Sequence, residues 1–258
     1  MGRTEKTRLR CGEVHMNNTY RAAESLGRVG YRRHPLALTV RILSYTLCGS
    51  AVIYAVVRVA TGAASADTKL FSPLIGLVLL GGIAVFERVI KRRLPTYLDV
   101  ALCLFICGAL PLGSTFDFYN LVPGWDKILH TFSGFVFFMC GMCIGDLLAG
   151  PGVKGKRRVA IVVVTALLVS VAVGALWEMF EYAGDSLFGM NNQRWQNGLV
   201  GETGDGNYIV TDPRGTAIVD TMTDVLLAFA GTLVCFVPVL AACLRKPGRL
   251  DIFTLIVV

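Results

Sequence analysis

The sequence has little charge, since only 17% of its 258 residues are Asp, Glu, Lys or Arg, whereas 54% are hydrophobic. Together with a mean hydropathy of +0.59, this composition excludes an ordinary soluble domain. No polar stretch is long enough to bury a core of its own, so the sequence predicts one integral membrane domain. The first 35 residues lack an apolar run and are rich in arginine, and we therefore expect no cleavable signal peptide.

The sequence also lacks the features of a nucleic-acid-binding or redox protein. Its net charge is +7, but the basic residues cluster beside apolar blocks, where membrane topology explains them. We therefore expect no nucleic-acid partner. All of the eight cysteines except Cys11 fall within apolar segments and are predicted to be small core residues. Cys140 and Cys143 have the spacing of a redox pair, but they lie between methionines inside an apolar segment, which favours packing.

What the chain does contain is a series of apolar segments, most of them near the roughly 20 residues that a membrane-spanning helix needs. These segments are 36–60, 71–90, 97–113, 127–148, 158–181 and 217–243. They predict an all-α, polytopic membrane protein of about six transmembrane helices. The transmembrane domain is predicted to cover 36–243, and several of its glycines are expected to allow close helix packing.

Basic residues concentrate in alternate connections, which predicts an orientation in the membrane. They lie in a tail at 1–35, in the second and fourth connections, and in a tail at 244–258. Both termini are therefore predicted to be cytoplasmic. The connections at 61–70, 114–126 and 182–216 then face outward, and the last is too long to be a simple turn.

Titratable residues gather at the outward ends of the last three apolar segments. A charged side chain deep in a bilayer costs about 2.5–3.5 kcal/mol on insertion scales, so these residues need an explanation. Asp126 and His130 are four residues apart and share a helix face. The pair Asp220 and Asp224 has the same spacing. The candidate site residues are Asp126, Lys127, His130, Glu178, Glu181, Asp220 and Asp224.

So many carboxylates cannot all remain ionised in one place without a counter-charge, and a cation is the simplest remedy. Carboxylates suit Mg²⁺, Ca²⁺ or Mn²⁺, and His130 also admits Zn²⁺ or Fe²⁺. The predicted cofactor is thus a divalent metal ion whose identity stays open. Its predicted ligands are Glu178, Glu181, Asp224, Asp220, His130 and Asp126. In the same hypothesis His130 or Glu181 is a general base, and Lys127 balances charge or meets an anionic substrate.

Several of these residues also have simpler interpretations. Asp126 follows a Gly-Trp pair and has the position of a helix N-cap. Asp220 lies near a helix start, where the helix dipole favours a negative charge. Asp185 fits an ordinary interfacial position, and His130 alone fits a hydrogen-bonded packing residue.

Three blocks, WDKILHTFSG, LWEMFEYAGD and DTMTDVLLAFAG, resemble the signature of the YjdF-like family of bacterial inner-membrane proteins, a domain of unknown function. That family is similar to the VanZ-like membrane proteins, some of which are associated with resistance to teicoplanin. The resemblance covers about 36–243 and carries over the seven candidate residues, with Gln193 or Gln196 as the counterpart of a further polar position. It implies a multi-pass protein of the bacterial plasma membrane and no established reaction.

Three functions remain open at this stage. The first is a metal-dependent enzyme that acts on an anionic lipid or cell-envelope intermediate at the outer leaflet. The second is an ion- or proton-coupled carrier. The third is a non-catalytic scaffold or lipid-binding protein whose polar residues lock three helices together. Membrane lipids are partners in all three, and the sequence does not set an oligomeric state.

Overall fold

A computed structural model describes residues 34–62, 68–195, 199–202, 208–210 and 217–257 of the chain. Six helices in this part are long and apolar enough to cross a membrane, which confirms the predicted all-α membrane fold. They are Pro35–Ala60, Lys69–Ile90, Thr96–Thr115, Trp125–Ala149, Gly155–Phe188 and Ala217–Arg245. The predicted basic tail lies outside the described residues, apart from its last two positions.

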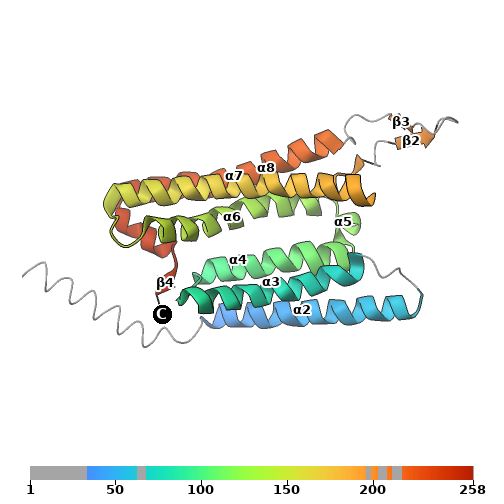
Figure 1. The fold of residues 1–258 in the computed structure, drawn as a ribbon, viewed down its shortest axis with the longest axis horizontal. Coiled ribbons are helices and arrows are strands. Elements are labelled where there is room, and N and C mark those ends of the chain that lie inside the picture. Colours follow the sequence, from blue (N-terminus) through green and yellow to red (C-terminus); the bar gives the residue numbers. More distant parts are fainter. Residues whose placement is uncertain (1–33, 63–67, 196–198, 203–207, 211–216, 258) are drawn as a thin grey trace, which may run out of the picture.

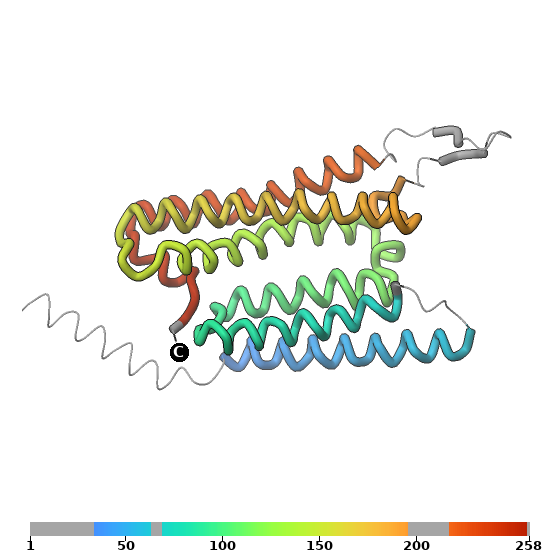
Figure 2. Tube along the Cα trace, in the orientation of Figure 1, coloured from blue at the N-terminus to red at the C-terminus, as the bar shows by residue number. Residues whose placement is uncertain are grey.

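The spans form two bundles that lie side by side (Figure 1). The first contains α2 (Pro35–Ala60), α3 (Thr68–Ile90) and α4 (Thr96–Cys107), which continues as the π-helical segment η1 (Gly108–Thr115). The second contains α6 (Trp125–Ala149), α7 (Gly155–Phe188) and α8 (Ala217–Arg245), and α5 (Phe118–Leu121) joins the two bundles. Figure 2 shows the start of α2 and the C-terminal segment at one end of the molecule. The opposite end, where α5, the starts of α6 and α8, and the end of α7 lie, is called the α5 end below.

The residues after α8 are folded and do not form a simple tail. The 3₁₀ segment η4 (Pro247–Ile252) buries Leu250, and β4 (Ile256–Val257) pairs antiparallel with β1 (Arg92–Arg93) after α3. This pairing connects the second bundle to the first at the C-terminal end. In the connection after α7, β2 (Leu199–Glu202) pairs antiparallel with β3 (Tyr208–Val210).

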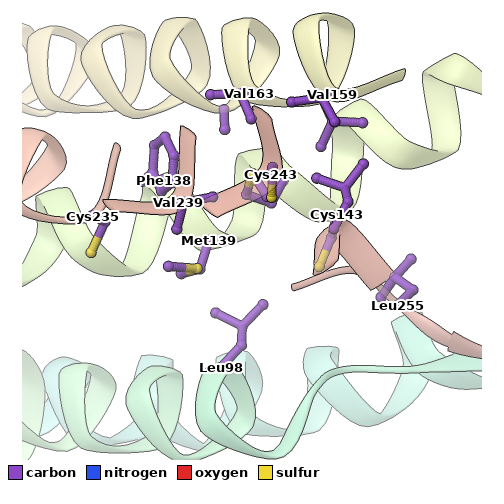
Figure 3. Close-up of a cluster of buried hydrophobic side chains, with 14 of the residues drawn as sticks. Leu98, Phe138, Met139, Cys143, Val159, Val163, Cys235, Val239, Cys243 and Leu255 are labelled. Carbon is purple, nitrogen blue, oxygen red and sulfur yellow. The ribbon is translucent and has the colours of Figure 1, made fainter. Parts of the chain in front are cut away.

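A hydrophobic core joins the two bundles (Figure 3). Leu98 points from α4 towards Met139 of α6, and the buried side chains of Val159 on α7 and Val239 on α8 complete the cluster. The cysteines behave as predicted for core residues. Those in the described part are free, and most are buried, so their role is packing.

Two glycines let α6 and α8 approach closely. A Cβ atom on Gly134 would overlap the carbonyl oxygen of Ala228, and one on Gly231 would overlap that of Thr131. The backbones of the two helices are therefore in direct contact, as in other small-residue helix crossings in membranes. Not every helical glycine has this role, because Gly81 on α3 has nothing within 4 Å of its would-be Cβ.

A buried ion triad holds the first bundle together near its C-terminal end. The Arg41 guanidinium of α2 donates through Nε to Asp99 Oδ1 of α4 at 2.6 Å. Its Nη2 donates to Glu87 Oε2 of α3 at 3.1 Å, and the second oxygen of Glu87 accepts from the backbone N–H of Leu94 at 3.0 Å. One cation thus joins three helices and donates a hydrogen bond to each of the two buried carboxylates.

Candidate functional site

The first turn of α6 brings the polar residues of the WDKILH block to the α5 end. Gly124, with a positive φ of 77°, is the residue that caps the start of α6, and it supplies no side-chain capping bond. The interpretation of Asp126 as the N-cap is therefore wrong, because this residue lies inside the first helical turn. Its carboxylate is free to turn towards α8, which explains why a charge occurs here.

Lys127 lies among three carboxylates from two helices. Its Nζ donates to Asp220 Oδ1 at 2.5 Å and to both carboxylate oxygens of Asp224 at 2.8 Å. The same atom is 3.3 Å from Asp126 Oδ2. Because Asp220 and Asp224 lie one turn apart on α8, one ammonium group bridges α6 and α8 directly.

His130 lies one turn deeper on α6 and faces acids on both sides of its ring. Its Nε2 atom is 3.5 Å from Asp126 Oδ1 and 3.8 Å from Asp224 Oδ2, whereas its Nδ1 atom is 3.7 Å from Glu178 Oε1. One ligand atom each from Asp126, His130 and Asp224 lie within 4.8 Å of one another. The two separations from His130 Nε2, 3.5 and 3.8 Å, are below the roughly 4.4 Å between opposite ligands that each lie 2.0–2.2 Å from a metal.

Glu178 of α7 is the least satisfied acid of the site. Its side chain is only 7% exposed, and neither carboxylate oxygen has a hydrogen-bond partner among the described residues. Its neighbours are the His130 imidazole and the Thr221 hydroxyl of α8. A buried carboxyl without a hydrogen bond is costly and needs an explanation, and an ionisable residue within a membrane span is a candidate functional residue.

Two other predicted acids are engaged elsewhere. Glu181 is half-buried and accepts from the indole Nε1 of Trp177 at 2.7 Å. Asp185 accepts the backbone N–H groups of Asn192 at 2.7 Å and Gln193 at 2.9 Å, so it shapes the turn after α7. Asp185 therefore has a structural role in this turn and does not contact Lys127 or His130 in the structure.

The turn after α7 returns two polar side chains to the site. Gln193 donates to the Thr221 hydroxyl at 2.6 Å, and Arg194 Nε lies 3.9 Å from Asp126 Oδ2. Arg194 also donates to the Tyr119 backbone carbonyl at 3.3 Å, which ties the turn to α5. Burial, together with the charge of Asp126, raises the pKa of the Tyr119 phenol. The alternative counterpart Gln196 lies outside the described residues.

Thr221 was missed by sequence reasoning. Its position directly after Asp220, three residues before Asp224, is the only sequence signal for a hydroxyl group at the centre of the cluster. The polar cluster is hereafter the set Asp126, Lys127, His130, Glu178, Asp220 and Asp224. Its four carboxylates face one ammonium and one imidazole at close range, so it has an excess of negative charge. Such a cluster attracts a cation.

A family model described as predicted membrane protein (DUF2238) matches residues 46–246, which include the whole polar cluster. The chain belongs to this family. It is therefore a multi-pass membrane protein. An uncharacterized protein of Thermotoga maritima is 28% identical over 112 residues, which make up 42% of this chain and 55% of that protein. The match thus spans about half the length of that relative. No solved structure matches the chain.

Proposed function

We propose that the protein is a membrane enzyme that binds a divalent cation and acts on an anionic lipid or cell-envelope intermediate. The observation that carries the proposal is the convergence of Asp126, His130 and Asp224 within 4.8 Å, next to the unpartnered carboxyl of Glu178. An oxygen-rich set with one imidazole suits Mn²⁺, Mg²⁺ or Zn²⁺.

The orientation of His130 supports this assignment. Its Nε2 atom faces the two ligand carboxylates, and its Nδ1 atom faces Glu178. A metal-bound histidine commonly directs its second nitrogen to a carboxylate, which fixes the ring and raises its basicity. When bound, a divalent ion lowers the pKa of a water molecule and polarises a phosphoryl or acyl oxygen. Lys127 then orients an anionic substrate group, and Glu181 remains the proposed general base at the rim.

We place the site at the outer face of a bacterial plasma membrane. The connections at the C-terminal end carry Lys91, Arg92, Lys154 and Arg157, among other basic residues, and this end is therefore the proposed cytoplasmic side. The YjdF-like and VanZ-like resemblance belongs to the same proposal, because all of its motif residues except Glu181 lie in the polar cluster.

A structural scaffold is the second candidate function. It is favoured by Lys127, whose bonds to Asp220 and Asp224 connect α6 to α8 without any ion. In that case, the cluster is a packing network and has no affinity for metals. An ion- or proton-coupled carrier, the remaining hypothesis, gains less support, because acids near the C-terminal end are paired with Arg41 or Arg158.

Thermal unfolding of the purified protein in detergent with Mg²⁺, Mn²⁺, Ca²⁺ or Zn²⁺ separates these functions. An ion at 100 times its dissociation constant stabilises the folded state by about 2.7 kcal/mol. Asp224→Asn removes a proposed ligand and should abolish this increase in stability. Asp251→Asn is the matched control, because it removes an exposed carboxylate that pairs with Arg158 at the C-terminal end, and it should leave the increase unchanged. Identical midpoints for the wild type at all ion concentrations would reject the metal site and favour the scaffold.

A further inference from the structure

A groove of about 590 Å³ runs along the membrane-exposed surface between α6 and α8. It begins at Lys127, one of the residues of the polar cluster. Its other lining residues include Phe132, Phe135, Leu227, Gly231 and Val234. The rings of Phe132 and Phe135, both of which line the groove, are stacked, with centroids 5.9 Å apart and planes inclined by 9°.

We propose that this groove seats the hydrocarbon chain of a phospholipid, whose phosphate lies at Lys127 beside the proposed ion. The inference rests on the proposed function and specifies its substrate class. The proposed occupant is one hydrocarbon chain of a membrane phospholipid, which enters the groove from the leaflet at the α5 end.

The shape and lining of the groove favour a hydrocarbon chain. From Lys127 to Phe135 the groove follows eight residues of α6, which is about 12 Å at 1.5 Å per residue. Apart from Lys127 and Thr131, its lining residues are apolar. Because α6 and α8 are both long and apolar enough to cross a membrane, we expect hydrocarbon chains beside the groove. The floor depends on Gly231, since a side chain there would overlap the backbone of Thr131 and separate the two helices.

The charges at the head of the groove favour a phosphate once an ion is present. Without an ion, the carboxylates Asp126, Asp220 and Asp224 outnumber the ammonium of Lys127, and an anionic headgroup is repelled. A divalent cation adds two positive charges and reverses the balance around Lys127 and Arg194. A phosphate can then contact the ion and Lys127 together, while its chain occupies the groove.

The test uses the full chain in lipid nanodiscs and a lysophosphatidic acid with a photoreactive diazirine in its chain. Peptide mass spectrometry should map the label to Phe132, Phe135, Leu227 or Val234 when Mn²⁺ is present. Val234→Trp fills the groove and should reduce this labelling several-fold. Val237→Trp is the matched control, because Val237 is 58% exposed on the same helix but does not line the groove. A monoacylglycerol with the same chain should label the groove several-fold less, because it lacks the phosphate.

The outcomes separate this inference from the proposed function. Labelling spread evenly over lipid-facing helices, or unchanged in Val234→Trp, overturns the groove site even if ions stabilise the protein. Equal labelling by the phosphate and alcohol probes overturns the phosphate part of the inference. Labelling confined to the groove, preferring phosphate and unaffected by chelation keeps the lipid seat but overturns the ion at its head, and with it the metal of the proposed function.

Discussion

Replacing Gly231 with alanine tests whether backbone contact between α6 and α8 sets the geometry of the polar cluster. The added Cβ would overlap the Thr131 carbonyl oxygen and lie 2.9 Å from its carbon, where ordinary contacts begin at 3.4 Å. The clash is with backbone, so relief requires the helices to separate, and we place the cost at about 3 kcal/mol, the upper end for overpacking. Alanine regains about 1 kcal/mol of helix propensity. The net destabilisation should be about 2 kcal/mol.

Gly81→Ala provides the matched control with the opposite sign. Its Cβ has nothing within 4 Å, so only the propensity gain of about 1 kcal/mol remains. Thermal unfolding in detergent should show a midpoint about 4–8 °C lower for Gly231→Ala and slightly higher for Gly81→Ala. Separation of the helices should also lengthen the 2.8 Å bonds between Lys127 and Asp224 and weaken stabilisation by divalent ions. If both alanine variants are as stable as each other, the close α6–α8 crossing is refuted.

Two further predictions concern orientation and the first bundle. In a cysteine-free background, Ser186→Cys at the α5 end should react with an impermeant thiol reagent from outside the cell. Lys156→Cys, at the opposite end, should react only after the cells are permeabilised. The reverse pattern would show that the predicted orientation in the membrane is wrong. Arg41→Gln should destabilise the protein by about 3–5 kcal/mol, because it removes the cation between buried Glu87 and Asp99. The same variant should keep its stabilisation by divalent ions, and loss of that response would show that the two ends are coupled.

The fold follows from the sequence because hydrophobic length is a strong local signal. All six predicted spans correspond to helices, but the fifth was expected at 158–181, whereas α7 extends to Phe188. Its 34 residues are about 51 Å long, so it exceeds the roughly 30 Å of the hydrocarbon core. Hydrophobicity marks where a helix leaves the bilayer, whereas its end is set by Gly189, which adopts a positive φ of 63°.

The composition of the site was only partly predictable. Asp126 and His130 are four residues apart, and in any α-helix residues with this spacing lie on the same face. Their proximity on α6 was therefore predictable from the sequence. The spacing of acids on α7 does not reveal that Glu178 turns to the centre while Glu181 pairs with Trp177. That choice depends on the rotation of α7 against α6 and α8, which is a property of tertiary packing.

Two buried ionic groups in the described part of the chain, the Arg41 triad and the polar cluster, differ in how well their acids are hydrogen-bonded. In the Arg41 triad, one guanidinium donates to both acids, and a backbone N–H supplies Glu87 with a further hydrogen bond. In the polar cluster, by contrast, both oxygens of Glu178 lack a hydrogen-bond partner among the described residues. A purely structural network gains nothing from leaving a buried carboxyl unsatisfied, since replacement by an apolar residue would be less costly. The unsatisfied carboxyl of Glu178 therefore supports the proposed cation site at the α5 end.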